Sequence, residues 1–341
     1  MKHLSFLFVF SLIFSSCSML WFSTTSVEIA KNAQEQAMKN SIILTNDNLP
    51  EINIDKPKKT IKKFMQPKIA AMIENSSASR PGLSQLQAAD IVFEAPAEGG
   101  ITRFLALYET LPVGYIGPIR SVRDYFLDWT QAFSSILIHR GGSETALAQL
   151  YSSSLMDIDE ANEDYKERYF YRNPKYDKPH DLFVNIQQVH YDNTVLSPKQ
   201  KTFQMIDTQV YYPQKTKKIF LNFSYDPYNV VYKYDKKSQT YLRYHGETPH
   251  NDTFYKKQIS VKNIIVQFTE YYTIDDKLRL SLRTEGKGEC IYFINGTSSD
   301  NCIWEKDEND MSYTDKSGYP LLFPQGNIWI EVIQKDKVSF Q

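Results

Sequence analysis

Two arginines three residues apart follow a Gly-Pro turn in the stretch "GPIRSVRDYF", residues 117–126. Ser121 and Asp124 have the spacing of a capping box, which predicts a helix that begins just after Ser121. Arg120 would then precede the helix, and Arg123 would lie in its first turn. Cations are disfavoured at the positive end of a helix dipole. Two arginines there indicate an anion that offsets them, either a bound ligand or carboxylates of the protein.

Carboxylates occur nearby in "DIVFEAPAEGGITRFLALYE", residues 90–109, where Gly99-Gly100 suits a two-residue hairpin turn. That turn would set three cross-strand pairs: Glu98 with Ile101, Pro96 with Arg103, and Glu94 with Leu105. Strand alternation then places Glu94, Glu98 and Arg103 on one face. This set predicts either a buried salt-bridge cluster, or a site where surplus positive charge binds an anion or one glutamate acts as a general base.

A third group of candidates ends the buried strand expected at "SSILIH", residues 134–139. In α/β sheets ligands gather at the carboxyl ends of strands, and a Gly-Gly turn exposes backbone N–H groups. The candidates here are His139, Arg140, Gly141, Gly142 and Ser143, the last of which can cap the next helix. Secondary candidates are Asp124 and the pairs His180-Asp181 and His250-Asp252, although a histidine beside an aspartate more often has a structural role.

The sequence also excludes several kinds of chemistry. It contains no GxSxG elbow, Walker loop, GxGxxG after a strand or HExxH. No Cys/His cluster has metal-ligand spacing, so we predict neither a metal nor a cofactor. The net charge of −1 argues against a dedicated nucleic-acid binder, which would carry a basic surface.

The elements that must position these residues change character along the chain. Residues 66–200 alternate strand and helix patterns and predict an α/β layer domain, with a helix at "RDYFLDWTQAF" whose apolar stripe is Tyr125, Phe126, Trp129 and Phe133. A short helix is expected at "LSQLQAA". Residues 201–341 are short strands separated by turn residues, which predicts an all-β sandwich or barrel. The expected fold class is α+β.

The N-terminus reads as a targeting segment. Lys2 precedes an apolar run from Leu4 to Phe14, and Ser15-Ser16-Cys17 resembles a bacterial lipobox, in which the cysteine thiol carries a lipid such as palmitate. We predict a signal peptide at 1–17, a polar tether at 18–65 and a chain anchored on the extracytoplasmic face of the cell membrane. An uncleaved membrane anchor is the alternative, because apolar character resumes at "MLWF".

Two further cysteines flank "IYFINGTSSDN", which has the pattern of strand, Asn-Gly turn and strand. A disulfide between Cys290 and Cys302 would cross this hairpin and stabilise the fold by about 3 kcal/mol. The alternative is two reduced, buried thiols.

Several stretches resemble the YerB-like lipoprotein family, whose domain is one of unknown function. In the first half these are "RPGLSQLQAADIVFEAPAEGGITRFLALYE", "GPIRSVRDYFLD", "HRGGSETA" and "YRNPKYDKPHDLF"; in the second half they are "TPHNDTF", "VKNIIVQFTE" and "NIWIEVI". The resemblance spans roughly Pro67 to Val332. It implies an envelope lipoprotein with an α/β N-terminal domain and a β C-terminal domain, and it brings no activity, substrate or catalytic residue.

Three functions follow as hypotheses. The leading one is an envelope lipoprotein that binds an anionic group, such as that of a wall polymer, through Arg103, Arg120, Arg123 and the turn from His139 to Ser143. The second is a hydrolase or transferase on envelope polymers, with Glu94 or Glu98 as general acid or base and His139 assisting. The third is a protein-interaction scaffold built on the β domain.

Overall fold

The computed structural model of the chain describes residues 63–193, 203–308 and 310–341. The predicted signal segment with Cys17, nearly all of the predicted tether and the predicted domain boundary near residue 200 lie outside these ranges, so they stay predictions. None of the helices in the described ranges is long and apolar enough to cross a membrane.

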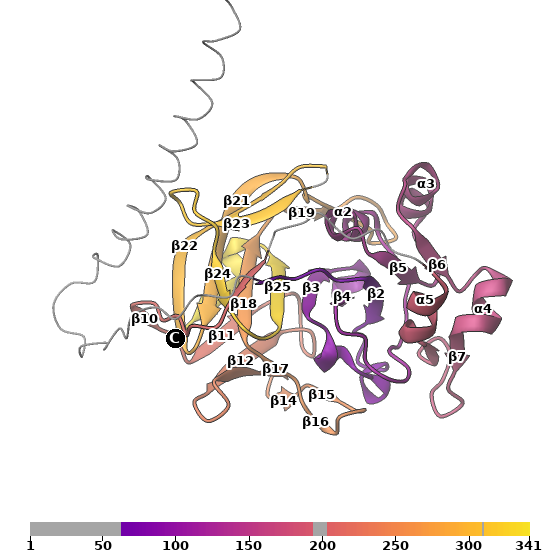
Figure 1. Cartoon of the computed structure of the whole chain (residues 1–341), viewed down its shortest axis with the longest axis horizontal. Coiled ribbons are helices and arrows are strands. Elements are labelled where there is room, and N and C mark those ends of the chain that lie inside the picture. The colour runs from indigo at the N-terminus through magenta and orange to yellow at the C-terminus, as the bar shows by residue number, and fades with distance from the viewer. Residues whose placement is uncertain (1–62, 194–202, 309) are drawn as a thin grey trace, which may run out of the picture. The chain divides into compact units, whose positions relative to one another are not determined.

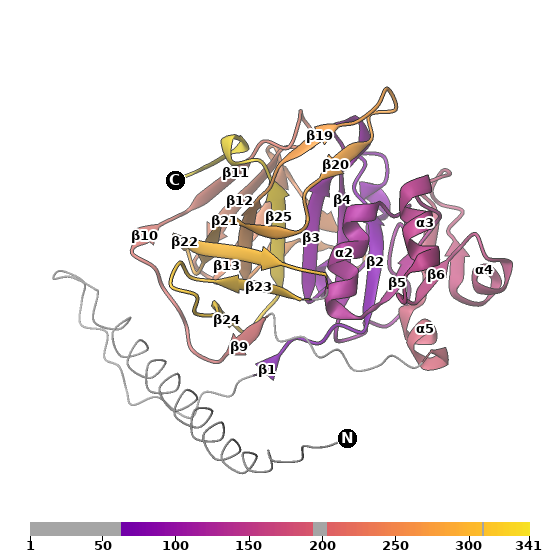
Figure 2. The ribbon, with the colours of Figure 1, turned by 90° about the horizontal axis from the view of Figure 1, so that it is seen from above.

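The α-helices of the described residues all lie between residues 124 and 192. They are α2 (Asp124–Phe133), α3 (Glu144–Ser152), α4 (Glu163–Tyr169) and α5 (Ile186–Asp192). Helix α2 lies against one face of the main sheet, and the predicted apolar stripe of this helix is buried (Figure 2). Trp129 stacks on Phe93 of the sheet with ring centroids 5.0 Å apart, which fixes the helix on its strand neighbours.

One mixed sheet of eleven strands runs through both halves of the chain (Figure 1). Its order is β10 (Gln214–Lys215), β22 (Thr297–Lys306), β21 (Gly286–Ile294), β18 (Asn263–Phe268), β25 (Ile328–Ile333), β3 (Ile91–Pro96), β4 (Thr102–Tyr108), β2 (Ile69–Glu74), β5 (Ile136–His139) and β6 (Asp157–Asp159), with β23 (Met311–Thr314) added on β22. Strand β25 pairs in parallel with both β18 and β3. The two halves are therefore joined by backbone hydrogen bonds between β25 and β3.

A second sheet packs on the C-terminal part of the first. It consists of β14 (Thr248–Pro249), β13 (Thr240–His245), β12 (Val230–Asp235), β11 (Lys218–Leu221) and β26 (Val338–Phe340), with β17 (Ser260–Val261) beside β13. Its inward residues share one apolar cluster with Phe104 and Trp329 of the main sheet. The alternating burial of β13 shows the half-buried sheet that its sequence predicts.

Smaller sheets complete the fold. One holds β1 (Lys63–Phe64), β9 (Gln204–Ile206) and β24 (Leu322–Pro324); the two-stranded ones are β7 (Phe170–Arg172) with β8 (Leu182–Val184), β15 (Asn251–Asp252) with β16 (Lys257–Gln258), and β19 (Tyr271–Thr273) with β20 (Leu280–Leu282). An α/β N-terminal half followed by an all-β C-terminal half confirms the predicted α+β class.

The predicted hairpin around the Asn-Gly turn is also present. Asn295 and Gly296 have φ angles of 49° and 75° and connect β21 to β22. Cys290 and Cys302 are direct cross-strand partners with Cα atoms 4.9 Å apart, and they form a disulfide.

The hairpin at Gly99-Gly100 differs from its prediction by one residue. Three residues, Glu98–Gly100, form a 3₁₀ turn, and the Ala97 amide donates to the Ile101 carbonyl at 2.7 Å. Ala95 is therefore the partner of Arg103, and Glu94 that of Phe104. A one-residue slip moves a strand's side chains to the other face, so Glu94 and Arg103 lie on opposite faces of the sheet and the predicted shared face is wrong.

Two local helix predictions are also corrected. Ser121 does not cap α2, because the helix begins two residues later than predicted, at Asp124, with Arg123 at the N-cap position and no side-chain cap. The short helix expected at "LSQLQAA" is a single 3₁₀ turn, Leu86–Ala88. Gln85, which precedes it, has a φ of 64°, and that left-handed conformation prevents an α-helix from starting earlier.

Candidate functional site

Arg103 and Arg123 meet the carboxylate of Glu98 at the tip of the β3–β4 hairpin. Arg123 donates two hydrogen bonds to this carboxylate, from Nε and from Nη2, the latter at 3.0 Å. Arg103 lies 3.9 Å from the same carboxylate and donates to the Ser121 carbonyl at 2.6 Å. The guanidinium groups of Arg103 and Arg123 thus link the β3–β4 hairpin to the loop that precedes α2.

Arg120 meets a second carboxylate, that of Glu74 at the end of β2. Its Nε is 3.5 Å from Glu74. The Nδ1 atom of His180 lies 3.0 Å from both oxygens of the same carboxylate, and the Ser76 hydroxyl donates to it at 2.8 Å. We call Arg103, Arg120 and Arg123, with Glu74 and Glu98, the outer arginine cluster.

Positive charge exceeds negative charge in the outer arginine cluster, since three guanidinium groups face two carboxylates. Burial, and then the charge of Arg123, lower the pKa of Arg103 to about 10, although Tyr125 and Glu98 act in the opposite direction. Burial alone would raise the pKa of Glu98, but its bonds to Arg123 leave that pKa below its usual value. The Asp124 carboxylate accepts a hydrogen bond from the Tyr125 amide at 3.1 Å and is not paired with an arginine.

The His139–Ser143 turn touches this cluster through its backbone alone. The Arg140 amide donates to the Arg120 carbonyl at 3.1 Å, and the Val122 amide donates to the Gly141 carbonyl at 3.0 Å. Ser143 caps α3 as predicted, accepting from the Ala146 amide at 3.2 Å. The side chains of the turn, however, bond to a different set of acids.

His139 is fully buried beneath this turn. Its Nε2 is 3.0 Å from Asp157 and its Nδ1 is 2.9 Å from the Gly141 carbonyl. Both partners are acceptors, so both ring nitrogens donate and the imidazolium form is favoured. Burial alone would lower the pKa of His139, but the bond to Asp157 and the nearby Asp159 leave it raised.

The other acids and bases of this region form a chain of ion pairs. Arg140 bonds to Glu160 at 3.0 Å, Glu160 to Arg172 at 2.7 Å, and Arg172 to Asp181 at 2.7 Å. Asp181 is therefore a partner of Arg172, while its neighbour His180 belongs to the outer arginine cluster. Asp252 lies elsewhere, where it accepts the amides of Gln85 and Gln87 and ties the C-terminal half to the N-terminal half.

Glu94 belongs to a second, fully buried group. It accepts hydrogen bonds from Asn75 at 3.1 Å, from Thr102 at 2.5 Å and from Arg243. Arg243 also contacts the Tyr232 hydroxyl at 3.2 Å, and the rings of His245 at 3.2 Å and His250 at 2.7 Å. Glu331 lies beside Glu94 in the β25–β3 ladder and accepts from Tyr232 at 2.5 Å. We call Arg243 with Glu94, Glu331, Tyr232, His245 and His250 the inner arginine cluster.

Five members of the two clusters were not among the candidates from the sequence: Glu74, Tyr232, Arg243, His245 and Glu331. A signal for Arg243 exists in "TYLRYH", where Tyr241, Arg243 and His245 alternate with outward residues and so face inward. Glu331 carries no such signal, because every residue of β25 is buried. The enzyme hypothesis gains nothing from this geometry: Glu94 and Glu98 are both paired with arginines, and neither of two described pockets is lined by them.

The architecture is thus that of an α+β protein whose two halves share one sheet, with an arginine–carboxylate cluster at a hairpin tip. Residues 56–198 match the family described as "Protein of unknown function (DUF3048) N-terminal domain", and residues 219–330 match the corresponding C-terminal domain. The chain belongs to this family, which confirms the resemblance found in the sequence.

Comparison with individual proteins agrees with this assignment. The chain is 29% identical over 283 residues to "Putative lipoprotein YerB" of Bacillus subtilis (strain 168), an alignment that covers 78% of this chain and 80% of that protein. The crystal structure of the YerB protein from Bacillus subtilis is similar, with a TM-score of 0.69 and 26% identity, and the match covers 81% of this chain and 94% of that one.

Proposed function

We propose that the chain is a lipoprotein anchored to the cell membrane, on its extracytoplasmic face, and that it binds an anionic group of an envelope polymer through the outer arginine cluster. The observation that carries the binding proposal is the charge imbalance there. The side chains of Arg103, Arg123 and Arg120 keep 11%, 17% and 24% of their surface exposed while they share two carboxylates. A guanidinium fork suits planar, bidentate recognition of phosphate or carboxylate.

Calorimetry on the full-length chain in detergent tests the binding proposal, with a short glycerol phosphate oligomer as the probe. We expect the Arg120→Ala/Arg123→Ala double variant to bind at least about tenfold more weakly, since two charge-assisted bonds are lost. Arg168→Ala removes an exposed arginine on α4 and serves as the matched control. Equal affinity of the wild type and a folded double variant would disprove the proposal.

The anchoring proposal rests on the name of the Bacillus subtilis relative and on the Ser15-Ser16-Cys17 pattern. Cells expressing the chain would be labelled with radioactive palmitate and fractionated. We expect label and membrane retention in the wild type, and loss of both in Cys17→Ser. A Cys17→Ser chain that stays in the membrane fraction would indicate an uncleaved anchor instead.

A further inference from the structure

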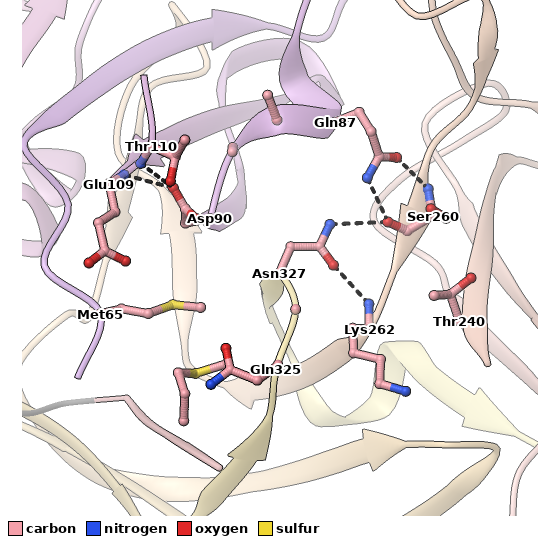
Figure 3. Close-up of a pocket in the computed structure, with 14 residues that line it drawn as sticks. Met65, Gln87, Asp90, Glu109, Thr110, Thr240, Ser260, Lys262, Gln325 and Asn327 are labelled. Carbon is pink, nitrogen blue, oxygen red and sulfur yellow. Dashed lines mark hydrogen bonds between the residues drawn. The ribbon is translucent and has the colours of Figure 1, made fainter. Parts of the chain in front are cut away.

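A pocket of about 430 Å³ lies where three adjacent parallel strands of the main sheet begin. It is bordered by the residues that precede β3, β18 and β25, namely Asp90, Lys262 and Asn327. Asp90 comes before β3 and Glu98 of the outer arginine cluster comes after it, so the two lie at opposite ends of that strand. Both halves of the chain line it (Figure 3). We call it the junction pocket.

Two side-chain amides make one wall of the junction pocket rigid. Gln87 accepts the Ser260 amide at 2.7 Å and donates to the Ser260 carbonyl at 3.0 Å. Asn327 donates to the same carbonyl at 3.0 Å and accepts the Lys262 amide at 2.8 Å. Figure 3 shows these four bonds converging on Ser260 and Lys262. The wall is therefore preorganised, and a ligand would not have to order it.

Two acidic residues, Asp90 and Glu109, line the pocket and disfavour an anionic ligand; Asp90 accepts the amides of Glu109 and Thr110 at 2.7 and 3.1 Å. The polar groups without a partner are uncharged. Among the described residues, the hydroxyls of Ser260 and Thr110 and the side-chain amide of Gln325 have no hydrogen-bond partner, and all three residues line the pocket. Lys262 turns its ammonium group to Asn295 at 2.7 Å and to the Gln239 carbonyl at 3.1 Å. The one lysine of the pocket is thus occupied and offers little to an anion.

Apolar surface completes the lining. Met65 and Met205 contribute thioether side chains, and Ala88 and Ala89 contribute methyl groups. The pocket thus offers free hydroxyls and an amide on one side, and methyl and thioether groups on the other. This lining suits a ligand that has both hydroxyl groups and a C–H surface. The volume is within the range of small-molecule sites, about 300–1,000 Å³.

We propose that the junction pocket binds an uncharged, hydroxyl-rich ligand, a sugar unit of one or two rings. An N-acetylated sugar fits the lining best, because its amide can pair with Gln325 and its methyl group can pack on the methionines. This inference is independent of anion binding at the outer arginine cluster, since the two sites share no residue and prefer ligands of different charge.

The test is a titration of the full-length chain with N,N′-diacetylchitobiose, followed by amide chemical shifts. We expect the amides of Ser260, Lys262 and Asn327 to shift, and inorganic phosphate to leave them unchanged. Removal of both free hydroxyls in Ser260→Ala/Thr110→Val should weaken sugar binding by about tenfold, as expected for two lost hydrogen bonds. The matched control is Thr273→Val/Ser339→Ala, which changes two exposed strand residues outside the pocket.

The outcomes separate the two proposals. Sugar-induced shifts at the pocket that persist in Arg123→Lys support the junction site whatever happens to anion binding. Absence of shifts at these three amides in the wild-type chain would overturn it, and so would equal sugar affinity of a folded Ser260→Ala/Thr110→Val chain. The wild-type shifts keep the test decisive if that variant does not fold.

Discussion

The outer and inner arginine clusters use the same residue types under opposite conditions. In the inner arginine cluster, Arg243, Glu94 and Glu331 have no exposed surface, and Arg243 contacts a carboxylate, a tyrosine and two histidines. In the outer cluster the arginines keep part of their surface and outnumber their carboxylates. In the inner arginine cluster the guanidinium donors are bonded to other groups of the protein. In the outer arginine cluster part of the guanidinium surface is exposed, and a ligand can reach it. Burial and charge balance, rather than arginine content, separate a structural cluster from a candidate binding site.

Charge in the inner arginine cluster is balanced by protonation. Burial, and then the charge of Glu94, raise the pKa of Glu331 well above its usual value, so this carboxyl is neutral. Burial alone would lower the pKa of Arg243, but Glu94 and Tyr232 leave it raised, so this guanidinium stays charged. The cluster joins Glu94 of the first half to Arg243 of the second, and it contributes to the junction between them.

The largest loss of unfolding free energy is expected from Arg243→Ala. Removing one member of a buried ion pair leaves its partner without compensation, which costs about 3–5 kcal/mol. Urea denaturation followed by circular dichroism would show this loss of unfolding free energy. Arg243→Lys keeps the charge but not the fork, and it should be intermediate. A loss below about 1 kcal/mol in Arg243→Ala would show that the inner arginine cluster does not hold the two halves together.

Acid should also act on the inner cluster. Arg243 donates to one nitrogen of His245 and one of His250, so each ring accepts there and is neutral. Burial, and then neighbouring positive groups that include Arg243, lower both histidine pKa values well below 6.5. The unfolded chain binds these protons near pH 6.5, so stability falls as the pH drops below that value, by up to about 1.4 kcal/mol per pH unit for each histidine.

Urea denaturation between pH 7.5 and 5 measures this slope. His250→Asn retains an acceptor for Arg243 but cannot titrate, and it should flatten the slope. His139 provides the opposite case: its raised pKa stabilises the fold below pH 6.5, and this contribution is lost as pH rises through the folded-state value. His139→Gln should therefore steepen the acid loss. Identical slopes in all three chains would contradict the assigned protonation states.

Sequence patterns predicted the elements better than the contacts between them. Local periodicity and turn chemistry predicted the α2 stripe, the β5 strand that ends at His139, the Ser143 cap and the Asn-Gly hairpin. The position of Glu94 could not be predicted in this way. The turn holds one residue more than expected, Glu98, and this shift of register places Glu94 on the sheet face opposite to Arg103. Its partner Arg243 lies 149 positions away, and no local pattern reports such a pairing.

A smaller effect is expected at Arg123. Its side chain is 17% exposed, so water partly screens its bidentate pairing with Glu98. We expect Arg123→Ala to lower the unfolding free energy by about 1–2 kcal/mol, well below the Arg243→Ala loss. Arg123→Lys should recover most of this stability yet still bind the glycerol phosphate probe more weakly, because an ammonium group cannot form the planar fork. Equal losses in Arg123→Ala and Arg243→Ala would remove the distinction between the two clusters.

The smallest effect is expected at Arg140, which tests whether pairing alone predicts stability. This arginine bonds to Glu160, a buried carboxylate, but its own side chain is 43% exposed. Glu160 keeps a second bond, to Arg172 at 2.7 Å, so Arg140→Ala does not leave it unpaired. We therefore expect a loss below about 1 kcal/mol by urea denaturation. Arg172→Ala, which would leave both Glu160 and Asp181 short of a partner, is the matched comparison and should cost more. If Arg140→Ala lowers the unfolding free energy as much as Arg172→Ala, the exposed arginine is essential to the ion-pair chain. Side-chain exposure would then not predict which guanidinium groups are free to bind a ligand.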